Sequence, residues 1–572
     1  MRMPRSRTTL CLLTATATGL TFQAYFNPHS SSFSRDSSNF PEKIRATIHG
    51  VLRSSRAIFA ITLTAVDYKF SLRRLPTDSD GYRRKLSEVH LRSAERILKL
   101  CEVNKGFYVK AGQFVAALRN VPKEYSLTLS VLQDQAVPYL FGAIKEVLIY
   151  NLRQDLSEIF LSLDENPIAA ASIAQVHRAV LKDGQEVAIK VQYPGLLQQL
   201  KIDTTTMSFL SKSVSWFFPD YRFEWLVSEF VEDIIVELVS GSRCMGGSNI
   251  VLKSPTMAGS WRGPRCGQDF IQEARNSERT TNNFKNNKML KIPRVFWDLT
   301  TNQVLTMQFC RGQKVDDVVY LKKHGIDPTK VAKVLVEIFA EMIFVHGFVH
   351  GDPHPGNILV RPEGPHGFSL VLLDHGIYKQ LDEGFRLKYC ELWKALVVVD
   401  SNKIKLLGEQ FGVAKYFRYF PVIFTGTTID SKRVLGGRMS AVEKSNLKKE
   451  LTSLKMEDIS SFMESLPPDF LRILRTDGLL RSIINKLGAS QRVRLLAYAK
   501  FALHGLSPKL NCESDSSVKA MLSRLKTHVS YLQLRLTLDV LELLHWVTLL
   551  APKLLQTCCG LFTRISTLSR RQ

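Results

Sequence analysis

Apolar residues recur at two spacings along the chain, and the change between them separates a helical start from a strand-rich middle. Residues 84–150 carry apolar side chains every three or four positions with few turn formers, which predicts helices. Between Pro167 and Pro194 the apolar runs are short and rich in β-formers, and Lys182-Asp183-Gly184 separates two of them. A turn signal between two short apolar runs predicts an antiparallel hairpin.

The second half of the chain returns to helical spacing. Residues 291–298 and 303–309 predict two more strands, after which residues 331–350 have the pattern of one long amphipathic helix. Residues 381–506 are largely helical by the same pattern. A β-rich half followed by an α-rich half predicts an α+β fold.

The stretch 532–562 is more strongly apolar and is interrupted by Pro552. Asp539 and Glu542 lie inside it, and a membrane-spanning helix rarely tolerates two acids. We therefore expect this helical tail to pack on the protein or to lie on a membrane surface.

The first 35 residues have the composition of a targeting segment. Residues 1–35 contain several arginines, many serines and threonines and no acid, which is typical of mitochondrial transit segments. Leu10 to Phe26 also resembles a signal-peptide core or a marginal membrane span, although its threonines weaken both interpretations. A basic tail without a targeting role is the remaining alternative. Import into the mitochondrion is favoured, with association at the inner membrane expected.

Composition narrows the classes of partner. The chain has 572 residues, 45% of them hydrophobic, which is enough for several buried cores. Its formal net charge of +24 suits an anionic membrane, organelle import or a nucleic acid. No basic run alternates with aromatic residues and no zinc-finger spacing occurs, so nucleic acid is not expected as a partner. The nine cysteines are scattered without a C-x-x-C pair, which argues for reduced thiols.

Three motifs occur in the order typical of phosphoryl-transfer enzymes. Such enzymes need a lysine on the phosphates of ATP, oxygen ligands for Mg²⁺ and an acid that orients the attacking hydroxyl. The motif VAIK places Lys190 on the second hairpin strand, where it can contact the phosphates. HGDPHPGN supplies Asp352 to orient the hydroxyl and Asn357 to bind Mg²⁺. LLDHG follows an apolar run and supplies Asp374 as the second Mg²⁺ ligand. Each motif alone could be a surface strand or a polar turn, but their order favours a catalytic site for ATP and Mg²⁺.

The predicted nucleotide loop departs from the protein-kinase pattern. A protein kinase has G-x-G-x-x-G before its strand lysine, whereas this chain has Ala169, Ala170, Ala171 and Ser172. Every alanine adds a β-carbon, which restricts the backbone and changes how its N–H groups meet phosphates. These four residues and Met307, on a later strand, are further candidates for contact with the nucleotide. The departure excludes an ordinary protein kinase.

Together these motifs resemble the UbiB family of atypical kinases, also called aarF-domain-containing kinases, over residues 84 to 500. Lys110-Ala111-Gly112-Gln113 matches the K-x-G-Q signature of that family, and AAASIAQVH matches its alanine-rich loop. HGDPHPGN and LLDHG complete the set. The variant DHG, with the segments VHLRSAERI, LDEGFRLKYCELWKAL and LRILRTDGLL, favours one subgroup of the family.

The resemblance implies an atypical two-lobe kinase-like fold with a helical K-x-G-Q extension. On a helix, Lys110 and Gln113 lie on one face with Gly112 beside them, so both can point into one cleft; a solvated helix face is the alternative. In the family these side chains enter the nucleotide pocket where a protein substrate would otherwise lie. The resemblance therefore implies a lipid-like or small substrate, or ATP hydrolysis coupled to a partner, in quinone or membrane-lipid homeostasis.

The same family has an E-L-D-F-x-x-E segment whose last glutamate pairs with the strand lysine, which assigns that role to Glu273. Here Glu237-Leu238 and Asp269-Phe270 are separated by residues 239–268, which are rich in Gly, Ser and Pro and lack an apolar period. The simplest hypothesis is an insertion, and a retained intron would produce one. A real insertion at this place would threaten the pair between Lys190 and Glu273.

The sequence thus predicts six parts. They are a targeting segment (1–35), a linker with a membrane-proximal helix (36–83), the helical extension (84–150), a kinase-like N-lobe (151–308), a kinase-like C-lobe (309–510) and an apolar helical tail (511–572). The favoured function is a Mg²⁺-dependent ATPase or phosphotransferase. Two alternatives are a weakly catalytic pseudokinase that acts as a nucleotide-gated scaffold, and a soluble phosphotransferase of the aminoglycoside kind, which leaves K-x-G-Q unexplained.

Overall fold

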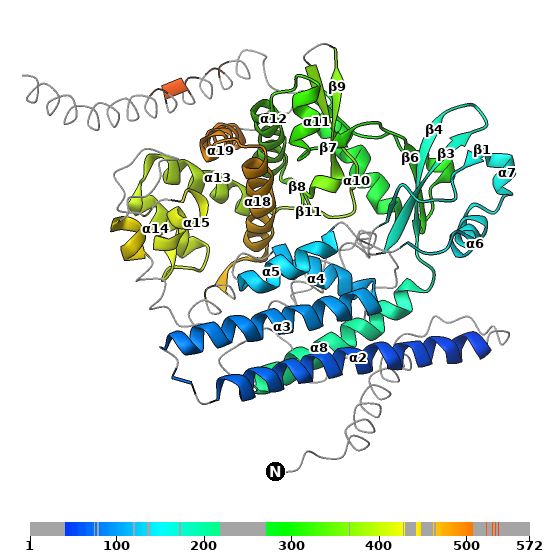
Figure 1. Ribbon diagram of the computed structural model, residues 1–572. Coiled ribbons are helices and arrows are strands. Elements are labelled where there is room, and N and C mark those ends of the chain that lie inside the picture. The colour runs from blue at the N-terminus through cyan, green and yellow to red at the C-terminus, as the bar shows by residue number, and fades with distance from the viewer. Residues whose placement is uncertain are drawn as a thin grey trace, which may run out of the picture. The chain divides into compact units, whose positions relative to one another are not determined.

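The computed structural model describes two main stretches, residues 40–217 and 270–506 (Figure 1). Within them it leaves out 74, 77–78, 118–120, 134–137, 171–172, 365–366, 427, 429–441, 448–461 and 463–464; beyond them it describes 522, 525, 529, 532, 533 and 536. The predicted targeting segment, the predicted insertion and most of the apolar tail therefore lie outside the described residues.

Contacts divide the chain into two units. The first comprises Met1–Gly312, Asn357–Arg361 and Ser369–Tyr378. The second comprises Gln313–Gly356, Pro362–Phe368 and Lys379–Gln572.

Helices of the first unit precede and flank its sheet. They are α2 (Phe40–Leu72), α3 (Asp80–Asn104), α4 (Phe107–Ala117), α5 (Lys123–Leu129), the 3₁₀ turn η2 (Ser130–Gln133), α6 (Phe141–Leu152), α7 (Leu156–Ile159), α8 (Leu196–Phe217), α10 (Phe270–Asn283) and the 3₁₀ turn η3 (Trp297–Leu299). In Figure 1, α2 runs alongside α3 and α8, and it contacts both of these helices. Helix α3 begins where the Ser79 side chain accepts a hydrogen bond from the Tyr82 N–H, and the left-handed φ of 52° at Lys105 ends it before α4 begins.

A five-stranded antiparallel sheet carries the strand lysine. Its strands are β1 (Phe160–Leu163), β2 (Ala169–Ala170), β3 (Ala174–Leu181), β4 (Glu186–Gln192) and β6 (Val304–Gln308). The order is β1-β3-β4-β6, with β2 beside β3. The predicted hairpin is confirmed as β3 and β4, and Gly184 turns the chain with a φ of +82° that favours glycine. Lys190 lies opposite Val176 on one side and Leu305 on the other.

The prediction for residues 291–298 was largely wrong. Only Leu290–Lys291 forms a strand, β5, while Val295 makes an isolated bridge to Met307 and residues 297–299 form η3. Pro293 has no N–H to give to a ladder, which explains why the pairing stops there. β5 pairs in parallel with β10 through Leu290 and Leu370.

The second half of the described chain is mainly helical, as predicted for 381–506. Its elements are β7 (Gln313–Lys314), α11 (Val318–Lys323), α12 (Pro328–Glu341), η4 (Met342–His346, a π turn), β8 (Phe348–His350), η5 (Pro355–Asn357), β9 (Ile358–Glu363), β10 (Gly367–Leu372), β11 (Tyr378–Gln380), α13 (Glu383–Val398), α14 (Ser401–Gln410), η6 (Phe417–Tyr419), α15 (Phe420–Phe424), α18 (Pro468–Lys486) and α19 (Gln491–Gly505).

The long helix predicted over 331–350 ends early. Helix α12 passes into the π turn η4, and Gly347 closes that turn in the left-handed conformation with φ of 60°. Glycine adopts this conformation without strain and commonly ends helices. The next three residues form β8 instead of a further helical turn.

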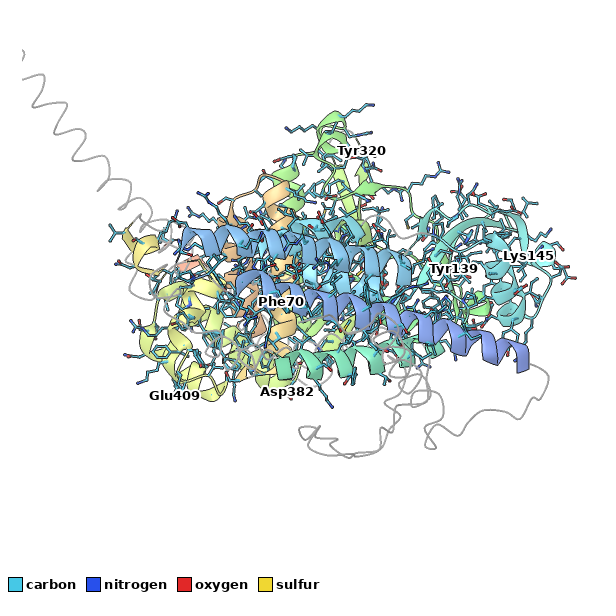
Figure 2. The ribbon with its side chains drawn as sticks, turned by 60° about the horizontal axis from the view of Figure 1, so that its bottom comes forward. Phe70, Tyr139, Lys145, Tyr320, Asp382 and Glu409 are labelled. Carbon is cyan, nitrogen blue, oxygen red and sulfur yellow. The ribbon has the colours of Figure 1, made fainter. Side chains whose placement is uncertain are left out.

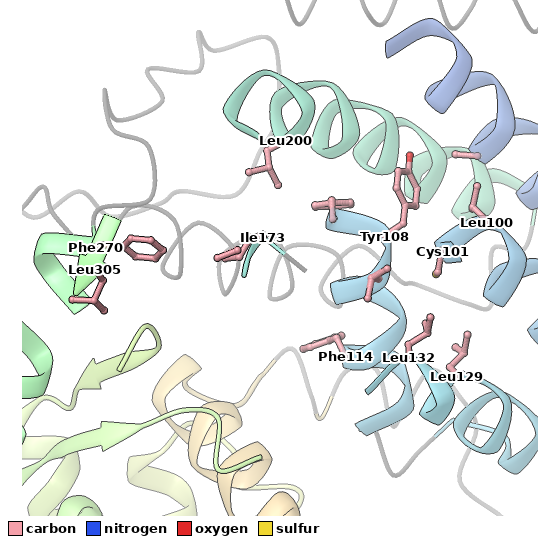
Figure 3. Packing of buried hydrophobic residues seen from close by; sticks show 14 of the residues in the cluster. Leu100, Cys101, Tyr108, Phe114, Leu129, Leu132, Ile173, Leu200, Phe270 and Leu305 are labelled. Carbon is pink, nitrogen blue, oxygen red and sulfur yellow. The ribbon is translucent and has the colours of Figure 1, made fainter. Parts of the chain in front are cut away.

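The core of the first unit joins the N-terminal helices to the sheet. One cluster contains Leu100, Tyr108, Phe114 and Leu200 from the helices and continues through Ile173 to Phe270 and Leu305. Figure 3 shows these side chains, with Ile173 between the helical group and the pair of Phe270 and Leu305. On the other face of the sheet, Ile144 and Leu148 of α6 pack against Val187, Ile189 and Val191. Because strand side chains alternate, this packing places Ala188 and Lys190 on the face toward α10.

In the second unit, aromatic side chains fill the space between η4, α13, α15, α18 and α19. The Trp393 and Tyr498 rings meet edge to face with centroids 4.9 Å apart, and Phe344 stacks on Tyr389. Among the described residues, no helix combines the length and apolarity needed to cross a bilayer.

Candidate nucleotide and metal site

Lys190 is held between two carboxylates. Its Nζ donates to both carboxylate oxygens of Glu273, at 2.8 and 2.9 Å, and lies 3.3 Å from Oδ2 of Asp374. Lys190 and Glu273 are buried, while the Asp374 side chain is 37% exposed. The structure therefore brings together three residues that the sequence placed 83 and 184 positions apart.

Helix α10 presents Glu273 to the sheet. Phe270 begins the helix, is fully buried, and its N–H donates to the carbonyl of Asn302 at 3.2 Å. The Lys190 Nζ also lies 5.4 Å from the centre of the Phe270 ring. The ion pair between Lys190 and Glu273, which an insertion was expected to threaten, is thus present in the full chain. The packing of Phe270 fixes the start of the helix downstream of that stretch.

The backbone around Asp374 fixes its position. The N–H of Leu373 donates to the carbonyl of Asn357 at 2.9 Å, which places the end of β10 beside the start of β9. The N–H of Gly376 donates to Oδ1 of Asp374 at 2.9 Å. One carboxylate oxygen is thus held by the backbone and the other is directed toward Lys190.

The Glu273 carboxyl has a shifted pKa. Burial raises the pKa of Glu273 to about 7, and the nearby Asp374 carboxylate adds to this rise, while the Lys190 ammonium opposes it. A buried acid whose pKa lies near neutrality is characteristic of functional sites, although structural ion pairs produce such shifts too.

The donor atoms suit Mg²⁺ better than a transition metal. Mg²⁺ prefers oxygen ligands, keeps several waters and is usually held by one or two carboxylates together with substrate phosphates. Asp374 offers a partly exposed carboxylate, and the backbone places Asn357 beside the strand that leads to it. Among the described residues, no group of three or more His, Cys, Asp or Glu could enclose a metal by itself. Asp374 and Asn357 therefore fit an ion that is completed by water and phosphate.

Asp352 belongs to the second unit and lies in a loop whose backbone N–H groups donate to two histidine side chains. Its N–H donates to Nδ1 of the buried His350 at 3.0 Å, and the N–H of Gly356 donates to Nδ1 of His354 at 3.1 Å. Thr476 of α18 lies 3.5 Å from the carbonyl of His350. The two histidines of HGDPHPGN thus hold the turn that presents Asp352, which is half-buried.

The alanine-rich loop begins as a strand. Ala169 and Ala170 form β2 and pair with Val176 and Gln175 of β3. Ala171 and Ser172 lie outside the described residues. Met307 is buried opposite Ala188, in the same cluster as Phe270.

The K-x-G-Q signature lies on α4. The Gln113 side-chain amide donates to the carbonyl of Leu132 at 2.9 Å, so this residue also ties α4 to η2. A β-carbon at Gly112 would lie 2.3 Å from Cδ1 of Leu132 and 3.2 Å from Sγ of Cys101, which explains the glycine by close packing. Lys110 lies on the same helix, and α4 shares its hydrophobic cluster with Phe270. Entry of Lys110 and Gln113 into the nucleotide pocket stays a prediction.

Sequence reasoning missed two residues next to this site. Asn276 of α10 donates from its amide to the carbonyl of His375 at 3.0 Å, and His375 is itself buried. The available signal was the spacing of Glu273, Asn276 and Thr280, which places three polar groups on one face of an amphipathic helix.

Comparison with known proteins identifies a kinase-like domain in this chain. Residues 131–239 and 267–407 match the ABC1 atypical kinase-like domain. The unmatched residues between them, 240–266, fall within the stretch predicted to be an insertion.

Similarity to whole proteins extends further. The chain is 38% identical over 443 residues to AarF domain-containing protein kinase 1 of Mus musculus, covering 77% of this chain and 78% of that protein. It is 33% identical to AarF domain-containing kinase 1 of Drosophila melanogaster, covering 78% and 81%. It is also 35% identical to a Dictyostelium discoideum protein named "Probable serine/threonine-protein kinase abkD", covering 84% and 64%. The subgroup that the DHG variant favoured is the one to which the first two relatives belong by name. By identity over most of its length, the chain belongs to the ABC1/AarF family of atypical kinases.

Proposed function

We propose that this protein binds ATP with Mg²⁺ and transfers or hydrolyses the terminal phosphoryl group. The observation that carries the proposal is the cluster of Lys190, Glu273 and Asp374, in which a buried ammonium is oriented by one acid and directed toward a second, partly exposed one. Phosphoryl transfer needs this combination of fixed positive charge and metal-binding oxygen.

Each residue has a distinct role in the proposal. Lys190 contacts the phosphates, and Glu273 orients it. Asp374 and Asn357 hold Mg²⁺, which when bound neutralises charge that develops on the phosphates. Asp352 orients the acceptor, either a hydroxyl or water. The backbone of β2, together with Met307 and the α4 residues Lys110 and Gln113, contributes to nucleotide binding.

A membrane surface is the proposed working environment, in mitochondrial quinone or membrane-lipid homeostasis. The family resemblance and the targeting composition of residues 1–35 support the mitochondrion. The exposed face of α2 supports the membrane. It carries large apolar side chains spaced three to seven residues apart, namely Ile48, Leu52, Phe59, Leu63, Val66 and Phe70.

The charges beside this α2 face point the same way. Arg56, Lys69 and Arg73 are exposed, and the only acid between residues 48 and 73, Asp67, is paired with Arg92 and Arg96 of α3. An exposed helix face that is apolar and basic suits an anionic lipid surface. In this proposal α2, in the first unit, contacts the membrane.

A nucleotide-gated scaffold is the second candidate. The alanine-rich loop favours it, since Ala169 and Ala170 pair with β3 and carry β-carbons that restrict the backbone more than a glycine loop does. Such a protein would bind ATP without measurable transfer.

Residues 239–268 are proposed to be an insertion that turnover does not need. The two segments that match the family domain end and resume at this stretch, which supports the proposal. Transcript sequencing distinguishes a translated insertion from a retained intron.

The deciding experiment measures Mg²⁺-dependent ATP turnover on liposomes that contain cardiolipin. The full chain and a chain that lacks residues 239–268 are each compared with an Asp374→Asn version. Turnover that Asp374→Asn abolishes supports the enzyme. Retained nucleotide binding without turnover in either chain supports the scaffold, and absence of nucleotide binding from both contradicts both functions. Addition of protein and lipid acceptors then separates transfer from hydrolysis.

A further inference from the structure

His375 follows the proposed metal-binding acid and is buried in a hydrogen-bonded position. In protein kinases the residue here is phenylalanine, and its packing distinguishes active from inactive arrangements. Here an imidazole occupies the position, with 2% of its surface exposed. A buried ring that carries two polar nitrogens is stable only where both are paired.

Both imidazole nitrogens have partners. Nε2 lies 3.2 Å from the carbonyl oxygen of Leu372, and Nδ1 lies 3.1 Å from the hydroxyl of Tyr378. A carbonyl can only accept, so Nε2 carries the proton, and the neutral ring accepts the Tyr378 proton at Nδ1. The Tyr378 ring also stacks on the imidazole, with centroids 5.7 Å apart and planes 14° apart. The imidazole thus binds a residue before Asp374, Leu372, and a residue after it, Tyr378.

The backbone of His375 ties the same loop to α10. Its N–H donates to Oε1 of Glu273 at 3.3 Å, and its carbonyl accepts from the Asn276 amide at 3.0 Å. The side-chain oxygen of Asn276 in turn accepts a hydrogen bond from the side-chain amide of Gln272. The carboxylate that orients Lys190 and the loop that carries Asp374 are therefore joined through one residue.

We propose that His375 is a positioning residue that couples the metal-binding loop to α10, so that Asp374 and Glu273 take up their places together. This proposal rests on the proposed nucleotide and Mg²⁺ site. The imidazole bonds to Leu372 and Tyr378, which a phenylalanine ring cannot make, hold the loop in the position from which the backbone N–H and carbonyl of residue 375 reach α10. Loss of the imidazole nitrogens leaves the Leu372 carbonyl and the Tyr378 hydroxyl buried without these bonds, and the loop backbone is then less firmly held for its two contacts with α10.

The test compares His375→Phe, which keeps an aromatic ring, with His375→Gln, which keeps a side-chain N–H that can donate to Leu372. Binding of a fluorescent ATP analogue to the full chain is titrated with Mg²⁺. The Phe variant should need on the order of tenfold more Mg²⁺ for half-maximal binding, as expected when a residue that orients a metal ligand is lost. The Gln variant should recover most of that affinity.

Hydrogen exchange supplies a readout that does not depend on nucleotide. Amides of α10, residues 270–283, should exchange faster in His375→Phe, while those of the hairpin strands β3 and β4 keep their wild-type protection. The double variant His375→Phe/Tyr378→Phe removes the hydroxyl left without its imidazole partner. It should regain thermal stability without regaining Mg²⁺ affinity.

The outcomes separate this inference from the proposed function. Equal Mg²⁺ dependence and equal α10 exchange in wild type and His375→Phe overturn the positioning role of His375. Equal impairment of the Phe and Gln variants also overturns it, because side-chain volume would then matter instead of hydrogen bonding. If the wild-type chain binds the analogue without turnover, catalysis is rejected. The Mg²⁺ dependence of binding and the α10 exchange still test the role of His375. If no analogue binds, the nucleotide site is rejected and α10 exchange alone decides.

Discussion

Arg53 of α2 and Asp203 of α8 form an ion pair that is almost fully removed from solvent, with 5% and 1% of their side chains exposed. Nε of Arg53 lies 3.1 Å from Oδ1 of Asp203, and the guanidinium also donates to the carbonyl of Asn104. The Asn104 amide returns a bond to the carbonyl of Arg53 at 3.1 Å. This network fixes α2 against α3 and α8, the scaffold on which the K-x-G-Q helix packs.

Removal of one partner of this pair should destabilise the first unit strongly. Arg53→Met leaves the Asp203 carboxylate buried without its cation, and loss of one partner of a buried pair typically costs about 3–5 kcal/mol. Denaturant unfolding should show that the double variant Arg53→Met/Asp203→Leu costs clearly less than the sum of the two single variants. Additive costs would mean that the two side chains act independently.

The burial of the Glu273 carboxyl should make stability fall as pH rises. The folded pKa of Glu273, about 7, lies above its unfolded value of 4.5, so the folded state binds this proton more tightly. The resulting stabilisation is fully present below pH 4.5 and is lost as pH rises through 7. The rise from 4.5 to about 7 corresponds to a loss of roughly 3 kcal/mol, since each pKa unit corresponds to about 1.4 kcal/mol.

The measurement is the free energy of unfolding from pH 5 to pH 8, for wild type and for Glu273→Gln. Asp203 has a pKa raised to about 6 by burial and contributes in the same direction, but the Gln variant retains it. The difference between the two proteins therefore isolates Glu273. A difference that does not change with pH would show that Glu273 stays ionised throughout the range.

The parts of this site that local pattern determines could be predicted, and the parts that depend on distant contacts could not. Alternation along β4 and the turn at Gly184 were enough to locate Lys190 on its strand. Glu273 was assigned through a split family motif, but no local signal shows that burial of Phe270 would restore the helix start. The network around His375 depends on partners from α10 and on Tyr378, and spacing alone does not reveal them. The helix over 331–350 was predicted too long because its apolar period continues past Gly347, whose left-handed conformation ends it.

Gly112→Ala should destabilise the K-x-G-Q helix. The new methyl group would overlap Cδ1 of Leu132, which is buried and cannot move freely, and overpacking of this kind costs about 1–3 kcal/mol. Gly142→Ala in α6 is the matched control, since a β-carbon there meets nothing within 4 Å and alanine favours helices. Thermal unfolding should show a lower midpoint for Gly112→Ala and an equal or higher one for Gly142→Ala.

Removal of the overlap tests the cause. Leu132→Ala alone should destabilise through a cavity, whereas Gly112→Ala/Leu132→Ala should recover part of the loss because the methyl group fills the vacated space. A double variant as unstable as the sum of both would place the role of Gly112 in its backbone instead of in the packing.

The apolar face of α2 should bind anionic membranes. Phe70, labelled in Figure 2, is 71% exposed, and Phe59 lies on the same face. Replacement of both by aspartate removes apolar area and adds charge that anionic lipid repels, each phenylalanine contributing roughly 1–2 kcal/mol to binding. Flotation with cardiolipin vesicles should fall at least about tenfold for Phe59→Asp/Phe70→Asp.

Val319→Asp is the control, because Val319 of α11 is 80% exposed but belongs to a helix without such a face, and it should float as wild type does. Equal flotation of all three proteins would reject α2 as the membrane contact, and truncation at 530 would then test the C-terminal segment from residue 532.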